Sequence, residues 1–272
     1  MALKINSAQN SLQSLNKSRQ SLADSLQRLA TGRSINKASD NSAGLIVADL
    51  LASQASGVGQ SIRNASDALA ITQVADGALS TGSEIVGRIR TLSLQAAQDG
   101  QSVESRKAIQ AEIDSSLKAL DDIAQTTSYN GQKLLTGTFT DKSFVVGGQS
   151  GENVTISISG ATSEQLGGLA DINVLSQQGA EQAIAAADQA LQQIDSNRAN
   201  LGATSNGLQA TINNLSATKI NLEAAQSQIA ETDFAEESMI LAKMKVLTKA
   251  QSFALTQTGQ INKNNLINLL QG

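Results

Sequence analysis

Few residues of this chain could do acid–base, metal or nucleophilic chemistry. Its 272 residues include no His and no Cys. This removes the commonest metal ligands, the usual general base at neutral pH and the thiol nucleophiles. Without Cys there are also no disulfides, so the chain is indifferent to the redox state of its compartment. We therefore expect no enzyme, no cofactor and no metal site.

Two pairs of neighbouring carboxylates are the nearest approach to a catalytic pattern. They are Asp121-Asp122 and Glu236-Glu237. Adjacent residues on a helix point in different directions, so the members of each pair would not share a substrate. We interpret both pairs as parts of a solvated helix face or of a helix cap.

The most informative pattern is apolar and lies at both ends of the chain. In residues 1–30 apolar side chains alternate three and four positions apart, with Arg19 as one polar member: Ile5, Ala8, Leu12, Leu15, Leu22, Leu26 and Leu29. Residues 240–272 repeat the alternation, with Gln251 and Thr258 as polar members: Ile240, Met244, Leu247, Ala254 and Ile261, then Leu266, Ile267, Leu269 and Leu270. This spacing predicts two narrow helical seams, each of which needs a partner helix.

Each seam is apolar along a single stripe, so its burial alone would not offset an ordering cost of about 1–2 kcal/mol per residue. We expect the two termini to lie side by side within a polymer and to be disordered in the free chain. An ordinary helix pair within one chain is the alternative. Arg19, Gln251 and Thr258 either fix the register of the helices or face a water-filled lumen.

The composition favours long helices. Aromatic residues make up 2% of the chain and Pro is absent, which suits helices packed through small and aliphatic side chains. A net charge of −4, without a basic patch, argues against nucleic-acid binding. No apolar run is long enough to span a membrane, residues 1–30 lack a secretory signal, and the narrow seams lack Trp. We expect no membrane partner, and export, if any, by a route other than the general secretory one.

The pattern along the chain predicts a mostly α fold of long antiparallel helices with heptad packing. The first seam precedes a polar break at residues 32–44, with a new N-cap at Ser39, Asp40 or Asn41. Helices follow to about residue 98, over 103–124 and from about 184 to 231, and Asp233 opens the last helix. Between them, alternation around residues 144–158 predicts a hairpin. The expected fold is thus a terminal two-helix coiled coil, helical arms and a small β-hairpin region at the tip.

Several stretches resemble bacterial flagellin, the subunit of the flagellar filament, over nearly the whole chain. They are MALKIN at 1–6, LATGRSIN at 29–36, DNSAG at 40–44, NNL at 213–215 and ETDFAEE at 231–237. Each is weak alone because its residues are common, but their order and their presence at both ends are specific. Only the short segment 130–180 stands where larger flagellins insert outer domains, so no exposed variable domain is expected.

The resemblance implies a division of the chain. Residues 1–42 with 232–272 would form a terminal coiled-coil domain in the inner layer of a filament. Residues 43–231 would form a helical rod outside it, with the β-hairpin region at about 133–175.

The resemblance also implies a function and partners. The chain would be a structural subunit that polymerises into the bacterial flagellar filament, is exported unfolded, folds its termini on assembly and serves swimming motility. The alternative is a hook–filament junction protein. The implied location is the extracellular filament. The implied partners are further copies of the chain, other flagellins, hook-associated proteins, the filament cap, the flagellar export apparatus and the flagellin chaperone.

An animal Toll-like receptor reads the outer helices of flagellins from some bacteria. The motif of that family maps onto Arg88, Leu92 and Glu112, whereas Thr91 stands where receptor-recognised members usually carry Glu. Receptor contact is therefore a hypothesis, beside the plain interpretation of an exposed Arg and Glu next to a core Leu.

Overall fold

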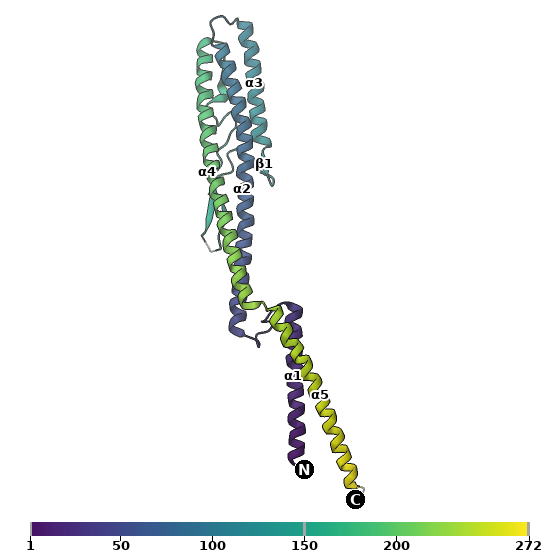
Figure 1. Ribbon diagram of the computed structural model, residues 1–272. Coiled ribbons are helices and arrows are strands. Elements are labelled where there is room, and N and C mark those ends of the chain that lie inside the picture. Colours follow the sequence, from purple (N-terminus) through teal and green to yellow (C-terminus); the bar gives the residue numbers. More distant parts are fainter. Residues whose placement is uncertain (1, 149–150, 271–272) are drawn as a thin grey trace. The chain divides into compact units, whose positions relative to one another are not determined.

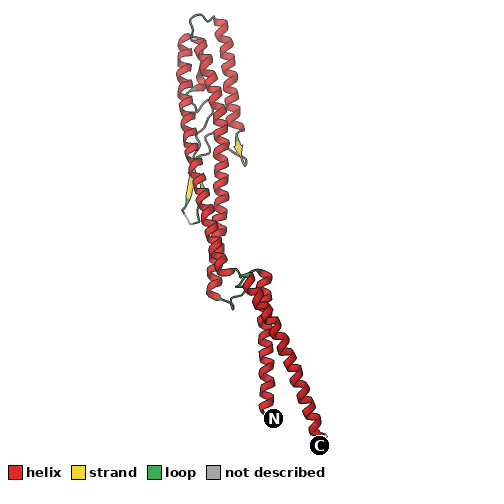
Figure 2. Ribbon diagram, viewed as in Figure 1, coloured by secondary structure: helices red, strands yellow, loops and turns green. Residues whose placement is uncertain are grey.

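The computed structural model describes the backbone of residues 2–148 and 151–270, and the side chains of residues 9–148 and 151–260. Five long helices dominate it (Figure 1): α1 (Ala2–Thr31), α2 (Ser42–Ala96), α3 (Val103–Thr126), α4 (Gln177–Ala230) and α5 (Phe234–Leu270). The strands are short (Figure 2): β1 (Ser128–Tyr129), β2 (Gln132–Lys133), β3 (Lys142–Val145) and β4 (Asn153–Ile156), with a 3-10 turn η1 (Leu169–Asp171). The predicted mostly α class with small hairpins is confirmed.

The chain divides into two compact units. Unit 1 comprises Met1–Ser53 and Asn221–Gly272, and unit 2 comprises Gln54–Ile220. Helices α2 and α4 supply residues to both units, which are described separately below. The domain boundaries implied by the resemblance, 42/43 and 231/232, stay a prediction.

Unit 2 is built on a close antiparallel pairing of α2 and α4. Fully buried alanines from both helices lie in its core: Ala65, Ala68, Ala75, Ala187 and Ala190. Such small side chains let helix backbones approach closely, and buried Leu79, Ile194 and Leu208 fill the remaining space. Two polar contacts fix the register: Thr72 Oγ1 lies 2.8 Å from Ser205 Oγ, and Arg198 Nε donates to Asp76 Oδ1 at 2.9 Å.

Helix α3 begins and joins the core as its sequence indicates. Ser102 is its N-cap and accepts a hydrogen bond from the Ser105 backbone N–H at 3.1 Å. Arg106 Nε donates to the Ala96 carbonyl at 2.9 Å, which satisfies the end of α2. One face of α3 is buried, through Ile109, Ile113, Leu120 and Ala124.

Two antiparallel hairpins follow α3. Strands β1 and β2 are joined through Asn130 and Gly131, whose positive φ angles of 47° and 79° are those of a tight hairpin turn. In the second hairpin, β3 pairs with β4 in the register Phe144↔Val154. It lies along the side of α2, where Ser61 Oγ donates to the Gly147 carbonyl at 2.6 Å and Asn64 Nδ2 donates to the Val145 carbonyl at 2.9 Å.

The segment after β4 is held to α3 by side chains of that helix. Asp121 accepts hydrogen bonds from both the backbone N–H and the hydroxyl of Ser163, at 2.7 and 2.8 Å. Gln110 accepts from the Val174 N–H at 2.8 Å. The interpretation of Asp121 as a merely solvated or capping residue is wrong, because its carboxylate anchors a loop.

In unit 1 the segment that follows α1 is hydrogen-bonded to the segment that precedes α5. Gly32, with φ 68°, ends α1 in the left-handed conformation usual for that position. Ser34 N–H then donates to the Ala230 carbonyl at 2.8 Å, and Thr232 N–H donates to the Gly32 carbonyl at 3.1 Å. The two chain segments that connect the helices of unit 1 therefore brace each other.

Both predicted caps of this region are formed. Asn41 Oδ1 accepts from Gly44 N–H at 2.9 Å at the start of α2. Asp233 Oδ1 accepts from Ala235 N–H and Glu236 N–H at 2.8 and 3.2 Å at the start of α5. Asp40 does not cap α2 but accepts from the N–H groups of Asn36 and Lys37 at 3.0 and 2.9 Å.

Candidate assembly interface

Helices α1 and α5 pair antiparallel within unit 1. Arg28 Nη1 lies 3.8 Å from Glu237 Oε2, and Gln251 Nε2 donates to Ser14 Oγ at 3.2 Å. The two contacts are fourteen residues apart on each helix. Residue numbers fall from 28 to 14 along α1 while they rise from 237 to 251 along α5, as in an antiparallel pair. The two helices lie together where α5 begins and draw apart toward the ends marked N and C (Figure 1).

The row of α1 that packs on α5 differs from the predicted seam. Its buried or half-buried members alternate leucine and serine: Leu15, Ser18, Leu22, Ser25 and Leu29. Three other positions of the predicted seam face outward: Leu12 is 51% exposed, Leu26 is 47% exposed, and Arg19 is exposed as well. Within one chain, two of the five described seam leucines of α1 are therefore exposed.

On α5 the predicted seam lies on the side of Glu237 and Gln251, which make polar contacts with α1. Ile240, Met244 and Leu247 are half-buried there, whereas Ala254 is exposed. The other seam members, Ile5, Ala8, Ile261, Leu266 and Leu269, lie outside the residues whose side chains the structure describes. The role of all these residues in assembly stays a prediction.

Of the three polar seam members, one takes part in the pairing. Gln251 contacts Ser14, as a residue that fixes register would. Arg19 and Thr258 are exposed, and Thr258 Oγ1 donates to the Ala254 carbonyl of its own helix at 2.6 Å.

The pairing also buries polar atoms without satisfying them. Ser25 is 2% exposed, and within the described part of the chain its hydroxyl oxygen has no hydrogen-bond partner. The same holds there for Glu237 Oε1 and Gln251 Oε1. Each such group costs about 1–3 kcal/mol, so the contact between α1 and α5 is weak for its length. For Glu237 the prediction of a solvated helix face or a helix cap is wrong, because its side chain is buried against α1.

Sequence reasoning also missed an apolar row on α5. Met239, Val246 and Phe253 are seven residues apart and exposed. The sequence carries this signal as a second series with seven-residue spacing, next to the predicted seam of Ile240, Met244 and Leu247.

The residues of the receptor hypothesis lie in unit 2. Arg88 Nη2 forms an ion pair with Glu112 Oε1 at 2.5 Å between α2 and α3, and both side chains are largely exposed. Leu92 is buried in a cluster with Ile89 and Ile113. Receptor contact stays a prediction.

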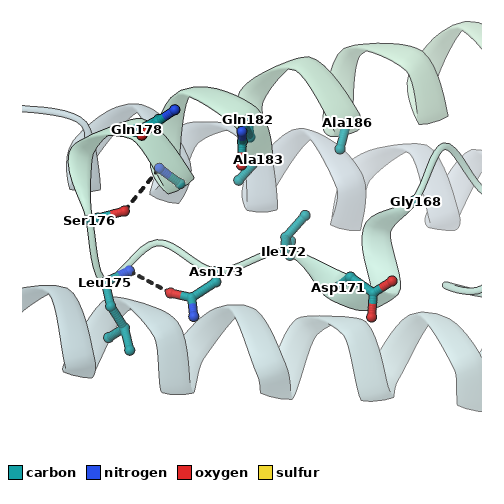
Figure 3. A pocket seen from close by; sticks show the side chains of 11 residues that line it. Gly168, Asp171, Ile172, Asn173, Leu175, Ser176, Gln178, Gln182, Ala183 and Ala186 are labelled. Carbon is teal, nitrogen blue, oxygen red and sulfur yellow. Dashed lines mark hydrogen bonds between the residues drawn. The ribbon is translucent and has the colours of Figure 1, made fainter.

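An open hollow of about 680 Å³ lies beside the start of α4 (Figure 3). Two of its polar side chains bond to the chain's own backbone: Asn173 Oδ1 accepts from Leu175 N–H at 2.9 Å, and Ser176 Oγ accepts from Gly179 N–H at 3.1 Å. Asp171 supplies the one charged group among its lining residues. The hollow therefore has no cluster of charged side chains that would mark a ligand site.

The described residues offer neither a metal site nor a membrane span. No group of three or more His, Cys, Asp or Glu residues there could hold a metal ion. None of the helices described is both long and apolar enough to cross a membrane. The terminal helix pair is thus the feature with the clearest functional character.

Two family models match the chain. The model described as the bacterial flagellin N-terminal helical region matches residues 4–140, and the bacterial flagellin C-terminal helical region matches residues 184–270. Flagellin A of Helicobacter felis is 44% identical over 146 residues, which is 54% of this chain and 28% of that protein. Flagellin A of Helicobacter pylori is also 44% identical over 146 residues, 29% of its length. The chain thus spans less than a third of the curated relatives it matches.

Solved structures share the fold. A crystal structure of Bacillus cereus flagellin superposes with a TM-score of 0.52 at 28% identity, over 60% of this chain and 94% of that one. A putative flagellar hook-associated protein of Vibrio parahaemolyticus superposes with a TM-score of 0.60 at 18% identity, over 71% of this chain and 100% of that one. At that identity the second likeness concerns the fold alone.

Proposed function

The chain belongs to the bacterial flagellin family, whose N- and C-terminal helical regions it matches over residues 4–140 and 184–270, and from this premise we propose that it is a structural subunit of the flagellar filament. It polymerises with copies of itself and so serves swimming motility. Its place is outside the cell, and it carries out no catalysis. Hook-associated proteins, the filament cap, the export apparatus and a flagellin chaperone are its further proposed partners.

The observation that best supports this proposal is that the terminal helix pair leaves two of its own leucines exposed. Leu12 and Leu26 are exposed at heptad-related positions while Ser25 occupies the interface with an unpartnered hydroxyl. A helix that turns a heptad leucine row outward requires another helix to cover it. The interface between α1 and α5 is therefore incomplete within one chain.

Assembly completes this interface at the cost of ordering the termini. In the free chain, burial along α1 and α5 is too sparse to offset backbone ordering of about 1–2 kcal/mol per residue, so the terminal segments are disordered before assembly and suited to export in an unfolded state. Each incoming copy adds apolar contacts that order both chains. The contacting surfaces of the two copies differ, so the contact is heterologous, and a rotation between copies that does not close into a ring makes the assembly a helical tube.

The hook–filament junction alternative has no observation of its own in support. The likeness to the hook-associated protein is one of fold at 18% identity, whereas the curated relatives at 44% identity are named Flagellin A.

The test is seeded growth. Purified chain is added to sonicated filament fragments and followed by electron microscopy, beside a truncated chain that lacks residues 240–272. The full chain is expected to elongate the seeds and the truncated chain to leave them unchanged. Failure of the full chain to elongate seeds over a wide range of concentration, with its rod helices folded, would contradict the proposal.

A further inference from the structure

The chain contains two pairs in which Gly follows Asn, Asn130-Gly131 and Asn206-Gly207. In such a pair the backbone nitrogen of the Gly can attack the side-chain amide of the Asn, because Gly has no side chain to hinder the approach. All four residues are exposed, and the space that a Cβ would occupy at either Gly is open. Solvent access therefore does not distinguish the two pairs, and a difference in their reactivity has to come from the backbone.

Asn130 and Gly131 form the turn of the hairpin between β1 and β2, at the end of α3 (Figure 1). Two residue pairs hold this hairpin together, and the pair next to the turn is Tyr129↔Gln132. A two-stranded hairpin is marginally stable by itself. The turn can therefore open while the helices of unit 2 stay folded, and opening frees the peptide between Asn130 and Gly131 to rotate.

Asn206 and Gly207 lie in the middle of α4. A helix uses the N–H of Gly207 in a hydrogen bond to the carbonyl four residues earlier and holds both residues at helical backbone angles. The residues on either side pack on the rest of unit 2, since Ser205 meets Thr72 of α2 and Leu208 is fully buried. Rotation of this peptide would require α4 to break where it packs on α2.

We propose that Asn130 is a site of spontaneous deamidation and isoaspartate formation, and that the fold protects Asn206 from the same reaction. The inference goes beyond the proposed function and does not depend on it, because it concerns the covalent chemistry of unit 2. It makes the β1–β2 turn the place where the folded chain changes chemically with age.

Water is the one reactant that the chain does not itself supply. The Gly131 nitrogen forms a bond to Asn130 Cγ, and the bond from Cγ to Nδ2 breaks. Nδ2 leaves as ammonia and takes the proton that the Gly131 nitrogen gives up. Water then opens the resulting cyclic imide. Attack at the side-chain carbonyl gives Asp, whereas attack at the main-chain carbonyl breaks the original peptide bond and gives isoaspartate, whose main chain runs through Cβ and Cγ.

The two products differ in what they do to the hairpin. Asp at position 130 tolerates a positive φ and keeps the chain length, so it adds a negative charge and little else. Isoaspartate adds a main-chain carbon to a turn that has two residues, and such a turn fixes the strand register by its length. The segment that follows enters the core, since Leu134 is fully buried and its N–H donates to the Thr127 carbonyl at 3.2 Å. Isoaspartate should therefore loosen this segment from the end of α3.

The test is an incubation of the full chain in mildly alkaline buffer, once folded and once in urea. Samples are digested at intervals, and mass spectrometry of the peptides measures the conversion of each Asn to the acid. Isoaspartate is detected by methyl transfer from S-adenosylmethionine with an isoaspartyl methyltransferase. Asn206 is the matched control within the same molecule, and circular dichroism establishes that the helices stay folded in buffer.

We expect Asn130 to be converted at least about tenfold faster than Asn206 in the folded chain, because the hairpin opens locally and the middle of α4 does not. In urea the two should react at similar rates. Equal rates in the folded chain overturn the inference, as does an equally large preference for Asn130 in urea, which would assign the difference to neighbouring residues. Conversion of Asn130 without methyl transfer to its peptide would exclude isoaspartate.

Amide exchange measures the structural consequence. The aged wild-type chain should lose protection at the Leu134 amide relative to the fresh chain. The control is an Asn130→Gln chain aged in the same way, because Gln would have to form a six-membered ring and reacts far more slowly. Its Leu134 amide should exchange at the same rate before and after ageing. Unchanged protection in a wild-type chain converted to isoaspartate would contradict the loosening of the segment after β2.

Discussion

Unit 2 closes a core around itself, whereas unit 1 fully buries few of its described apolar residues. Among the described side chains, the buried apolar residues of unit 1 are Leu15, Ile35, Ala48 and Ala230, and every other one belongs to unit 2. Both units consist mainly of long helices with heptad-like spacing. The difference lies in what covers these helices. In unit 2, α3, two hairpins and a loop cover α2 and α4, whereas in unit 1 α1 and α5 cover each other.

Polar groups follow the same division. In unit 2 the buried hydroxyl of Thr72 donates to the Leu69 carbonyl at 2.7 Å and meets Ser205. In unit 1 the buried hydroxyl of Ser25 meets no partner among the described residues. Helical periodicity therefore predicts that an apolar face needs to be buried, but not whether the same chain or another copy buries it.

The largest expected difference comes from removing one leucine in each unit. Leu79→Ala should lower the free energy of unfolding of unit 2 by about 2–5 kcal/mol, because Leu79 is fully buried and leaves a cavity. Leu12→Ala should change the stability of the free chain by less than about 0.5 kcal/mol, because that side chain is already exposed. Urea unfolding followed by circular dichroism measures both. Equal losses would remove the contrast between the units.

A second test replaces a satisfied buried hydroxyl. Thr72→Val keeps the shape of the side chain but leaves Ser205 Oγ without its partner, so unit 2 should lose about 1–2 kcal/mol. The same urea titration reports this loss. An unchanged midpoint would mean that the contact between Thr72 and Ser205 adds nothing to the pairing of α2 and α4.

The matching substitution in unit 1 should have the opposite sign. Ser25→Ala removes a buried hydroxyl without a partner, so pairing of α1 with α5 should gain about 1 kcal/mol, near a fivefold shift toward the paired state. Amide exchange rates in α1 of the free chain measure this ratio. Ser238→Ala, at an exposed position of α5, controls for the helix propensity of Ala. A loss of pairing in Ser25→Ala would show that the hydroxyl is satisfied.

The smallest effect concerns pH and the turn before α2. Hydrogen bonds from the N–H groups of Asn36 and Lys37 hold the pKa of Asp40 below its ordinary value. A carboxyl whose pKa is lowered by folding stabilises the folded turn above its unfolded pKa, and that stabilisation is lost as pH falls through the lowered pKa. Protection of the Asn36 and Lys37 amides should therefore decline in acid, and Asp40→Asn should remove this pH dependence. Protection that rises in acid would contradict the hydrogen-bonded turn.

Much of the fold could be predicted from particular residues. Asn41 and Asp233 are good N-caps in any context, and Asn130-Gly131 forms a tight turn, so local chemistry decided these features. Helix α4 begins at Gln177 and not near residue 184, because Ser176 caps it ahead of its first large apolar residue. The spacing of apolar residues could not predict this start, because Ile184 is the first large apolar residue of α4.

The assembly interface could be predicted only in part. Residues 12–29 offer two overlapping stripes, one of leucines alone and one in which leucines alternate with serines, and periodicity alone does not say which stripe faces α5. The choice depends on contacts such as those of Arg28 with Glu237 and of Ser14 with Gln251, which join residues far apart in the sequence.

Amide hydrogen exchange on the free and the assembled chain tests whether the terminal helices become ordered only on assembly. We expect amides of residues 2–30 and 240–270 to exchange with little protection in the free chain and to become protected in the assembled chain. Amides of the buried helices in unit 2 should be protected in both states. Strong protection of both terminal helices in the free chain, equal to that of unit 2, would contradict ordering on assembly.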